Sequence, residues 1–321
     1  MAENFITCIN TTLPAFVLIL LGLALSRAGL MPEDFTAKLN RFVFLFPLPV
    51  MVFYDLASKN FREAWNGRFV FFCFAATLLS IGGITLISGP LCRKAPEERG
   101  EFIQAAYRSS AAILGVMLAE NMYGDAGMIP MMILGAVPLY NAFAVVVLIM
   151  YGPKENEKDQ AVSHDLLRHT LLNILKNPLI FSIFLGLAWS LSGTRFPVIA
   201  DRTLSSISAT ATPLGLLALG ASIRAGRILS RLKLTLIAVF LKLAGLGMIF
   251  IPVAVWLGFR NDTLLAAVIM CGSPTTVTSF VMAKGFGNNG DLSGAAVLIT
   301  TLLSSVTLTG WLFLLRTLGY L

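Results

Sequence analysis

Seven long stretches without a charged residue constrain the fold of this chain more than any other feature. Each is long enough to cross about 30 Å of hydrocarbon as an α-helix. Only 13% of the 321 residues are charged, whereas a soluble domain carries about a quarter. The sequence therefore predicts an all-α membrane protein. The stretches are residues 4–26, 69–92, 126–153, 177–194, 203–223, 263–283 and 292–315.

Three further apolar stretches contain charged residues and bring the predicted number of membrane helices to ten. They are residues 39–58, 101–121 and 233–258. The longest polar connection falls between the fifth and the sixth predicted helix. We therefore expect a first five-helix unit at 1–152, a connecting loop at 153–165 and a second five-helix unit at 166–321.

The two halves of the sequence resemble each other. The segment "LGLALSRAG" (21–29) matches "LGLAWSLSG" (185–193), and the same offset of 164 residues aligns Ser109 with Ser273. Because each half has an odd number of helices, the second half must cross the membrane in the opposite direction. The sequence thus predicts inverted five-helix repeats, which are typical of transporters.

The basic residues predict the orientation. With the N-terminus outside, the inner loops carry about twice as many Lys and Arg residues as the outer ones, as the positive-inside rule requires. Glu3 precedes the first apolar stretch and Arg27 follows it, which is the reverse of a secretory signal. We expect both termini outside, and the short loops favour a bacterial inner membrane.

The predicted ninth helix contains "CGSPTTVTSF" (271–280), an unusual composition for the middle of a membrane helix. A proline removes a backbone donor and interrupts the helix, and the neighbouring hydroxyls can satisfy the freed backbone groups. The predicted fourth helix, "YRSSAAILGVMLAENMYG" (107–124), has serines at the matching position. Two broken helices would present helix N-termini that favour an anion. The alternative is a simple proline kink. The candidate residues are Ser109, Ser110, Ser273, Pro274, Thr275 and Thr276.

Charged and polar residues inside the predicted spans are further candidates. Arg108 lies within the fourth span, and a charge there indicates function by default. It would contact a carboxylate or set a positive potential, or else play a structural role. Asn141 would line a cavity or pack in the core. Asp55 is the candidate for ion coupling, or else a helix-end partner of Lys59.

Five segments together resemble the auxin efflux carrier family, which includes the plant PIN-formed carriers. They are "LNRFVFLFPLPVMVFYDLAS" (39–58), the fourth-helix segment, "TATPLGLLALGASI" (210–223), "SPTTVTSFVMAKGFG" (273–287) and "TTLLSSVTLTGWLFLL" (300–315).

This resemblance implies ten helices in inverted repeats, with broken helices four and nine crossing, and transport of small organic anions such as auxin or malonate. Pro49 and Tyr54 of the first segment join the candidate substrate-binding residues. Two departures stand out: Ser110 replaces a frequent asparagine, and Val116 replaces a frequent proline after Gly115.

The leading hypothesis is a secondary carrier of a small organic anion that works by alternating access, without a cofactor or a metal. The sequence has no phosphate-binding loop of the GxxxxGK[ST] type and no basic stripe for nucleic acid. Membrane lipids are expected partners, and a homodimer is left open. The alternatives are a membrane sensor with a transporter-like fold and a membrane-embedded lipid enzyme. The enzyme would need clustered carboxylates or histidines, but the predicted spans offer only Asp55 and Glu120, both isolated.

Overall fold

The computed structural model describes residues 2–58, 66–152, 178–224, 226 and 231–321, and within these ranges the regular structure is entirely helical. The predicted loop 153–165 lies outside them. The helices are α1 (Ala2–Arg27), α2 (Glu33–Leu45), α3 (Pro47–Ala57), α4 (Gly67–Leu91), the short 3₁₀ helix η1 (Pro96–Glu98), α5 (Arg99–Tyr107), α6 (Ala111–Tyr123), α7 (Ile129–Tyr151), α9 (Pro178–Ser192), α10 (Val198–Ser222), α12 (Leu232–Phe240), the π-helical turn η2 (Leu241–Gly245), α13 (Leu246–Trp256), α14 (Asn261–Gly272), α15 (Thr278–Gly285) and α16 (Asp291–Thr317).

Seven of the described helical stretches are long and apolar enough to cross a membrane. They are Ile6–Arg27, Glu33–Ala57, Gly67–Leu91, Ile129–Tyr151, Val198–Ser222, Leu232–Trp256 and Asp291–Thr317. The predicted span 177–194 corresponds to α9, which is apolar but shorter. The predicted spans 101–121 and 263–283 are each divided into two short helices. The count of ten spans therefore stays a prediction.

Two of the long stretches are less regular than the sequence predicts. The second begins at Glu33 and is bent at Phe46, because Pro47 starts a new helix there. The eighth predicted span widens into a π-helical turn around Lys242, and such turns often mark functional sites.

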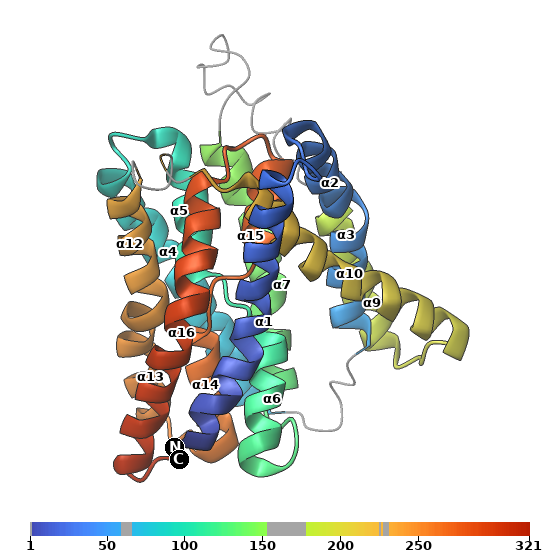
Figure 1. Cartoon of the computed structure of the whole chain (residues 1–321). Helices are drawn as coiled ribbons and strands as arrows, with labels where there is room; N and C mark the ends of the chain where they lie inside the picture. The colour runs from blue at the N-terminus through green and yellow to red at the C-terminus, as the bar shows by residue number, and fades with distance from the viewer. Residues whose placement is uncertain (1, 59–65, 153–177, 225, 227–230) are drawn as a thin grey trace, which may run out of the picture.

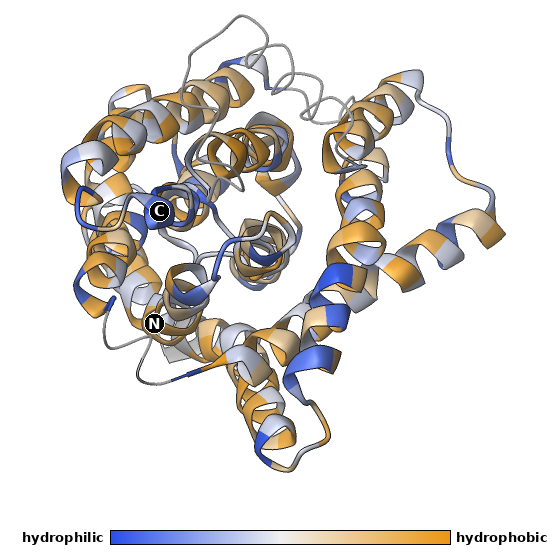
Figure 2. Ribbon diagram, turned by 90° about the horizontal axis from the view of Figure 1, so that it is seen from above, coloured by the Kyte–Doolittle hydropathy of each residue, from blue (hydrophilic) through white to orange (hydrophobic). Residues whose placement is uncertain are grey.

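Helices α1 and α10 pack closely against each other (Figure 1). Through this contact α16 and α6, which pack on α1, are joined to α2 and α3, which pack on α10. Gly22 of α1 faces the backbone carbonyl of Leu217, and Gly220 of α10 faces that of Ile19. No side chain fits at either glycine, so the two backbones approach as small residues allow in membrane helix pairs. On its other side α10 packs against α3, which also contacts α9. Seen from above, α9 and α10 extend away from the main bundle, and the outward surfaces are largely apolar (Figure 2).

Both termini lie at one end of the molecule, and the connections after α1, α4 and α15 lie at the opposite end (Figure 1). The predicted orientation in the membrane and the inverted repeat stay predictions. The broken helices are visible directly: α5 continues into α6 and α14 into α15 through short non-helical segments, and the two paths cross near the middle of the bundle (Figure 1).

Candidate functional site

The fourth predicted helix is interrupted at residues 108–110, although no proline or glycine occupies the interruption. Helix α5 ends at Tyr107, the backbone of Arg108 is extended (φ −71°, ψ 137°), and α6 begins at Ala111. The missing proline after Gly115 therefore does not prevent the break. Gly115 itself lies inside α6, where an added Cβ would come 3.1 Å from the side chain of Ile129. It serves close packing rather than the interruption.

The ninth predicted helix is interrupted at residues 273–277, around the proline. Helix α14 ends at Gly272, and Ser273 is extended (φ −70°, ψ 158°). This conformation follows from Pro274, because a proline ring disfavours the helical region for the residue before it. Helix α15 resumes at Thr278.

The two interruptions bond to each other. The N–H of Ser110 donates to the carbonyl of Pro274 at 2.8 Å. The Ser109 hydroxyl donates to the carbonyl of Met270 at 2.5 Å, and the Thr275 hydroxyl donates to that of Ala105 at 2.8 Å. Met270 and Ala105 lie in the last turns of α14 and α5, where carbonyls lack intrahelical donors. The hydroxyls thus satisfy the backbone groups that the breaks release.

A pocket of about 190 Å³ lies against this crossing. Helices α1, α6, α10 and α16 each contribute to its wall, together with the second interruption. Its lining combines apolar side chains with hydroxyls, and no charged residue is among the described residues that line it. The lining residues are Thr12, Ala15, Leu18, Ser110, Leu114, Thr212, Leu216, Pro274, Thr275, Val277, Val297 and Thr301.

The N-terminus of α6 is the main polar feature beside this pocket. Ser110 and Leu114, which bound the first turn of α6, both line it. The first N–H groups of a helix have no intrahelical acceptor, and the Ser110 side chain makes no capping hydrogen bond to them. These donors carry partial positive charge and favour an anion. The arrangement can bind a carboxylate without a cationic side chain in contact.

Arg108 is buried at the crossing, with only 2% of its surface exposed. Its guanidinium donates to Oδ1 of Asn141 at 2.7 Å and to Oγ1 of Thr278 at 2.8 Å, and one nitrogen contacts the sulfur of Met282 at 2.8 Å. It does not line the pocket. The guanidinium is therefore engaged by side chains of α7 and α15 rather than by the pocket.

Lys242 is a second buried cation near the same place, with no exposed surface. Its ammonium group donates to the carbonyl of Cys271 at 2.8 Å and lies 3.4 Å from that of Met270. A cation is favourable at the C-terminal end of a helix, so Lys242 stabilises the broken end of α14. Among the described residues, neither Lys242 nor Arg108 forms an ion pair with a carboxylate.

The remaining predicted residues divide into two groups. Ser273 and Thr276 belong to the crossing: the Ser273 hydroxyl is buried without a partner among the described atoms, and that of Thr276 lies 3.2 Å from the Thr278 hydroxyl. Asn141 joins them through Arg108. The structure places Pro49, Tyr54 and Asp55 elsewhere, on α3.

The residues on α3 face a different set of neighbours from those at the crossing. The Tyr54 hydroxyl donates to Asp201 of α10 at 2.9 Å, and its ring stacks on Phe196. Pro49 is buried in α3, and Asp55 is half-buried beside Tyr54. None of the three lines the pocket at the crossing.

Sequence reasoning missed several contributors. The amide of Gln104 donates to the carbonyl of Ser279 at 2.9 Å and joins α5 to α15. The pocket is also lined by Thr12, Thr212 and Thr301. A hydroxyl within an apolar run was the sequence feature that could have indicated each of them.

The prediction that Asp55 and Glu120 are the only carboxylates inside the spans is wrong. Glu101 is buried to 1% exposure, and its carboxylate accepts from the N–H groups of Gly290 and Ser293 at 2.8 and 2.9 Å. It caps the N-terminus of α16 and lies about 10 Å along the helix from Arg108. Over the described part of the chain, no group of His, Cys, Asp and Glu side chains could hold a metal ion.

Comparison with known proteins finds similarity along nearly the whole chain. The profile of the family described as "Membrane transport protein" matches residues 7–312. A protein of Rhizobium meliloti (strain 1021) named "Putative malonate transporter" is 26% identical over 307 residues, which cover 95% of this chain and 94% of that protein. The "Auxin efflux carrier component 5" of Arabidopsis thaliana is 29% identical over 147 residues, covering 44% of this chain and 42% of that protein.

Proposed function

Because the chain belongs to the family of membrane transport proteins, we propose that it is a secondary carrier of a small organic anion and works by alternating access. The observation that carries this proposal is the pocket of about 190 Å³ against two bonded helix interruptions. An interrupted helix is stable at membrane depth only where protein or a cavity satisfies its backbone. A pocket built there is a natural place for a transported molecule.

The charge balance around the crossing favours an anion. Arg108 and Lys242 are buried and have no carboxylate partner among the residues described. A buried cation is costly unless something compensates it, and both are held only by neutral groups. An anion in the neighbouring pocket would supply the missing opposite charge.

The same geometry makes release feasible. The pocket offers helix N–H groups and hydroxyls rather than a guanidinium in contact, so a bound carboxylate would not form a two-pronged pair with arginine. A carrier must let its cargo go on the other side of the membrane. We therefore assign Arg108 the role of setting the local potential and of positioning α15 through Thr278.

The substrate we propose is a carboxylate. The name of the Rhizobium meliloti relative makes malonate one candidate, and the apolar part of the pocket wall admits monocarboxylates with a hydrophobic body. The proposal also includes ten spans in two inverted repeats, with both termini outside a bacterial cell membrane. Motion of the crossing relative to α1 and α10 would expose the pocket to each side in turn.

The test is uptake of labelled mono- and dicarboxylates into vesicles reconstituted with the purified full chain. Ser110→Ala removes a hydroxyl of the pocket, and we expect the KM to rise about tenfold, since a hydrogen bond to a charged group contributes about 1.5–3 kcal/mol. Ser206→Ala is the matched control, because Ser206 is exposed on α10 and bonds only its own helix.

Pro274→Ala is expected to lower uptake while leaving folded protein in the membrane, because the interruption at Ser273 depends on the proline ring. Vesicles that take up no carboxylate of the panel above the level of empty vesicles would contradict the proposed function.

A further inference from the structure

A second and larger pocket, of about 640 Å³, lies apart from the crossing. It is formed at the end of the molecule where α1 connects to α2, between α2, the end of α10 and the end of α15. It shares no lining residue with the pocket at the crossing. The lining residues are Glu33, Thr36, Ala37, Asn40, Arg41, Phe44, Leu45, Ala221, Ser222, Arg224, Lys284, Gly285 and Gly287.

Three cations from three separate elements line this pocket. Arg41 comes from α2, Arg224 from the segment after α10, and Lys284 from the last turn of α15. Glu33 is the only carboxylate among the lining residues. Within the described ranges Arg41 and Lys284 form no ion pair. Among the described residues, the lining therefore carries three cations against one carboxylate.

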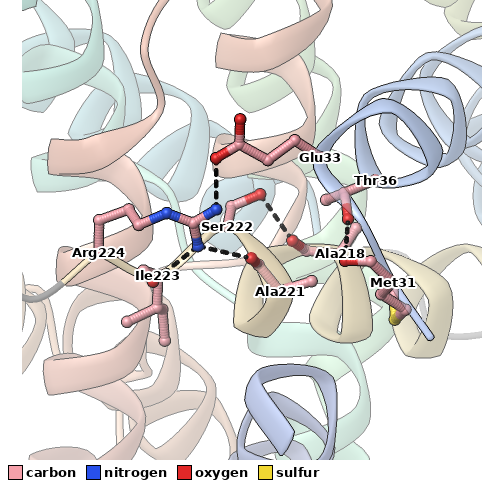
Figure 3. A network of polar contacts seen from close by, with 8 residues as sticks. All are labelled: Met31, Glu33, Thr36, Ala218, Ala221, Ser222, Ile223 and Arg224. Atoms are coloured by element: carbon pink, nitrogen blue, oxygen red, sulfur yellow. Dashed lines mark hydrogen bonds and ion pairs between the residues drawn. The ribbon is translucent and has the colours of Figure 1, made fainter. Parts of the chain in front are cut away.

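Arg224 is held by one carboxylate, which an anion could replace, and by two backbone carbonyls, which an anion would leave in place. Its guanidinium pairs with Glu33 at 2.5 Å and donates to the carbonyls of Ala221 and Ile223 at 3.2 Å each (Figure 3). The Glu33 side chain is 83% exposed, so this ion pair is weak and readily exchanged. Asn40 also lines the pocket, where its carboxamide NH₂ group can donate to an anion, and its oxygen has no partner among the described atoms.

The outer side of α2 next to the pocket is apolar. Phe42, Leu45 and Phe46 are each about half exposed, and Leu45 also lines the pocket. A ligand that joins a phosphate to hydrocarbon would place its charge among the cations and its chains along α2. A soluble phosphate compound would use the cations alone.

We propose that this basic pocket binds a phosphate-bearing anion, and that its source is the headgroup of an anionic phospholipid. Basic pockets between membrane helices are suited to such headgroups. The bound headgroup would connect α15, which continues from the interruption at Pro274, to α2 and α10. Lipid composition would thereby regulate how freely the crossing moves. The binding itself does not depend on the transported substrate.

The experiment is a titration of the purified full chain in detergent with phosphatidylglycerol, followed by native mass spectrometry, with phosphatidylcholine as the neutral lipid. We expect the double variant Arg41→Gln/Lys284→Gln to bind phosphatidylglycerol at least tenfold more weakly, from about fivefold for each charge removed. Lys38→Gln is the matched control, because Lys38 is exposed on α2 but does not line the pocket.

The Glu33→Gln variant separates a loss of the site from a loss of folding, because its expected effect is a gain of phosphatidylglycerol binding. It removes the carboxylate that competes for Arg224, so we expect phosphatidylglycerol to bind more tightly, which an unfolded protein could not do. Pyrophosphate separates the two sources: if it binds more tightly than the lipid and with the same dependence on Arg41 and Lys284, the source is a soluble phosphate compound rather than a lipid. The proposed site would be overturned if the double variant bound phosphatidylglycerol as tightly as the wild type. It would also be overturned if Lys38→Gln lost as much affinity for this lipid as the double variant.

Discussion

Replacing Gly220 by alanine tests whether the close contact of α1 with α10 shapes the pocket at the crossing. The added Cβ would overlap the carbonyl oxygen of Ile19 and lie 3.0 Å from the backbone nitrogen of Leu23. Ordinary contacts begin at 3.4 Å, so the two helices would have to move apart to admit the methyl group. Because backbone atoms are involved, no side-chain rotation relieves the overlap.

The expected cost follows from this geometry. Overpacking in a close-packed interior typically costs about 1–3 kcal/mol, and we expect the upper part of this range because both partners are backbone. Leu18 of α1 and Leu216 of α10 line the pocket and neighbour the contact, so uptake should fall together with stability. The assay is the thermal transition of the purified protein in detergent, with uptake measured in parallel.

Gly82→Ala is the matched control for this variant. Gly82 lies in α4, and nothing lies within 4 Å of an added Cβ there, so alanine should preserve or slightly raise stability. If Gly220→Ala melts and transports like the Gly82→Ala control, the reasoning about the α1–α10 contact is refuted.

Three further predictions concern topology, pH and the buried arginine. Cysteine introduced at Lys94 should react with a membrane-impermeant reagent only from the cytoplasm and at Asp125 only from outside, since both are exposed and the four native cysteines are buried; the reverse pattern would invert the orientation. Burial raises the pKa of the Glu98 carboxyl to about 7 despite its ion pair with Arg231. The folded state therefore holds this proton more tightly than the unfolded state, so stability should fall as pH rises from about 4.5 to about 7. The side chain of a Glu98→Gln variant does not titrate, so a melting temperature that changes with pH in the variant as it does in the wild type would disprove this. Arg108→Lys should keep much of the uptake and Arg108→Gln should lose at least tenfold, because the charge acts without contact; equal loss in both would indicate direct binding of the carboxylate.

The interruption of the ninth helix could be predicted from sequence because its cause is local. A proline excludes the helical conformation at Ser273, and the hydroxyls around it mark polar backbone in an apolar run. The interruption of the fourth helix has no such local cause. Its prediction rests on the alignment of Ser109 with Ser273 and on the family resemblance, and in the structure the interruption is maintained by bonds to the other interruption.

The direction of the Arg108 side chain could not be predicted. Its partners Asn141 and Thr278 are 33 and 170 residues away in the chain, and only the tertiary fold brings them together. The same limit applies to Glu101, which the sequence did not single out although it lies at the start of the predicted span 101–121. Its carboxylate is buried because it caps a helix that begins about 190 residues later.

Pro49 and Tyr54 were grouped with the substrate site because they share a predicted span of the segment that resembles the family, and Asp55 of the same span was the candidate for ion coupling. The bend at Phe46 separates α3 from α2, and α3 packs against α9 and α10. In the structure Tyr54 is engaged with Asp201 rather than with the crossing. A substrate-binding role for these residues stays a prediction.

The most direct test of the central claim is equilibrium binding of a transported carboxylate to the purified protein after the pocket at the crossing has been filled. Ala15 lines the pocket from α1, and Ala15→Phe would occupy much of its 190 Å³ while leaving the residues of both interruptions unchanged. Val17→Phe is the control on the same helix, because Val17 is 53% exposed and faces outward. We expect binding to be lost in Ala15→Phe and unchanged in Val17→Phe. Wild-type affinity in a folded Ala15→Phe protein would contradict a substrate site at the crossing.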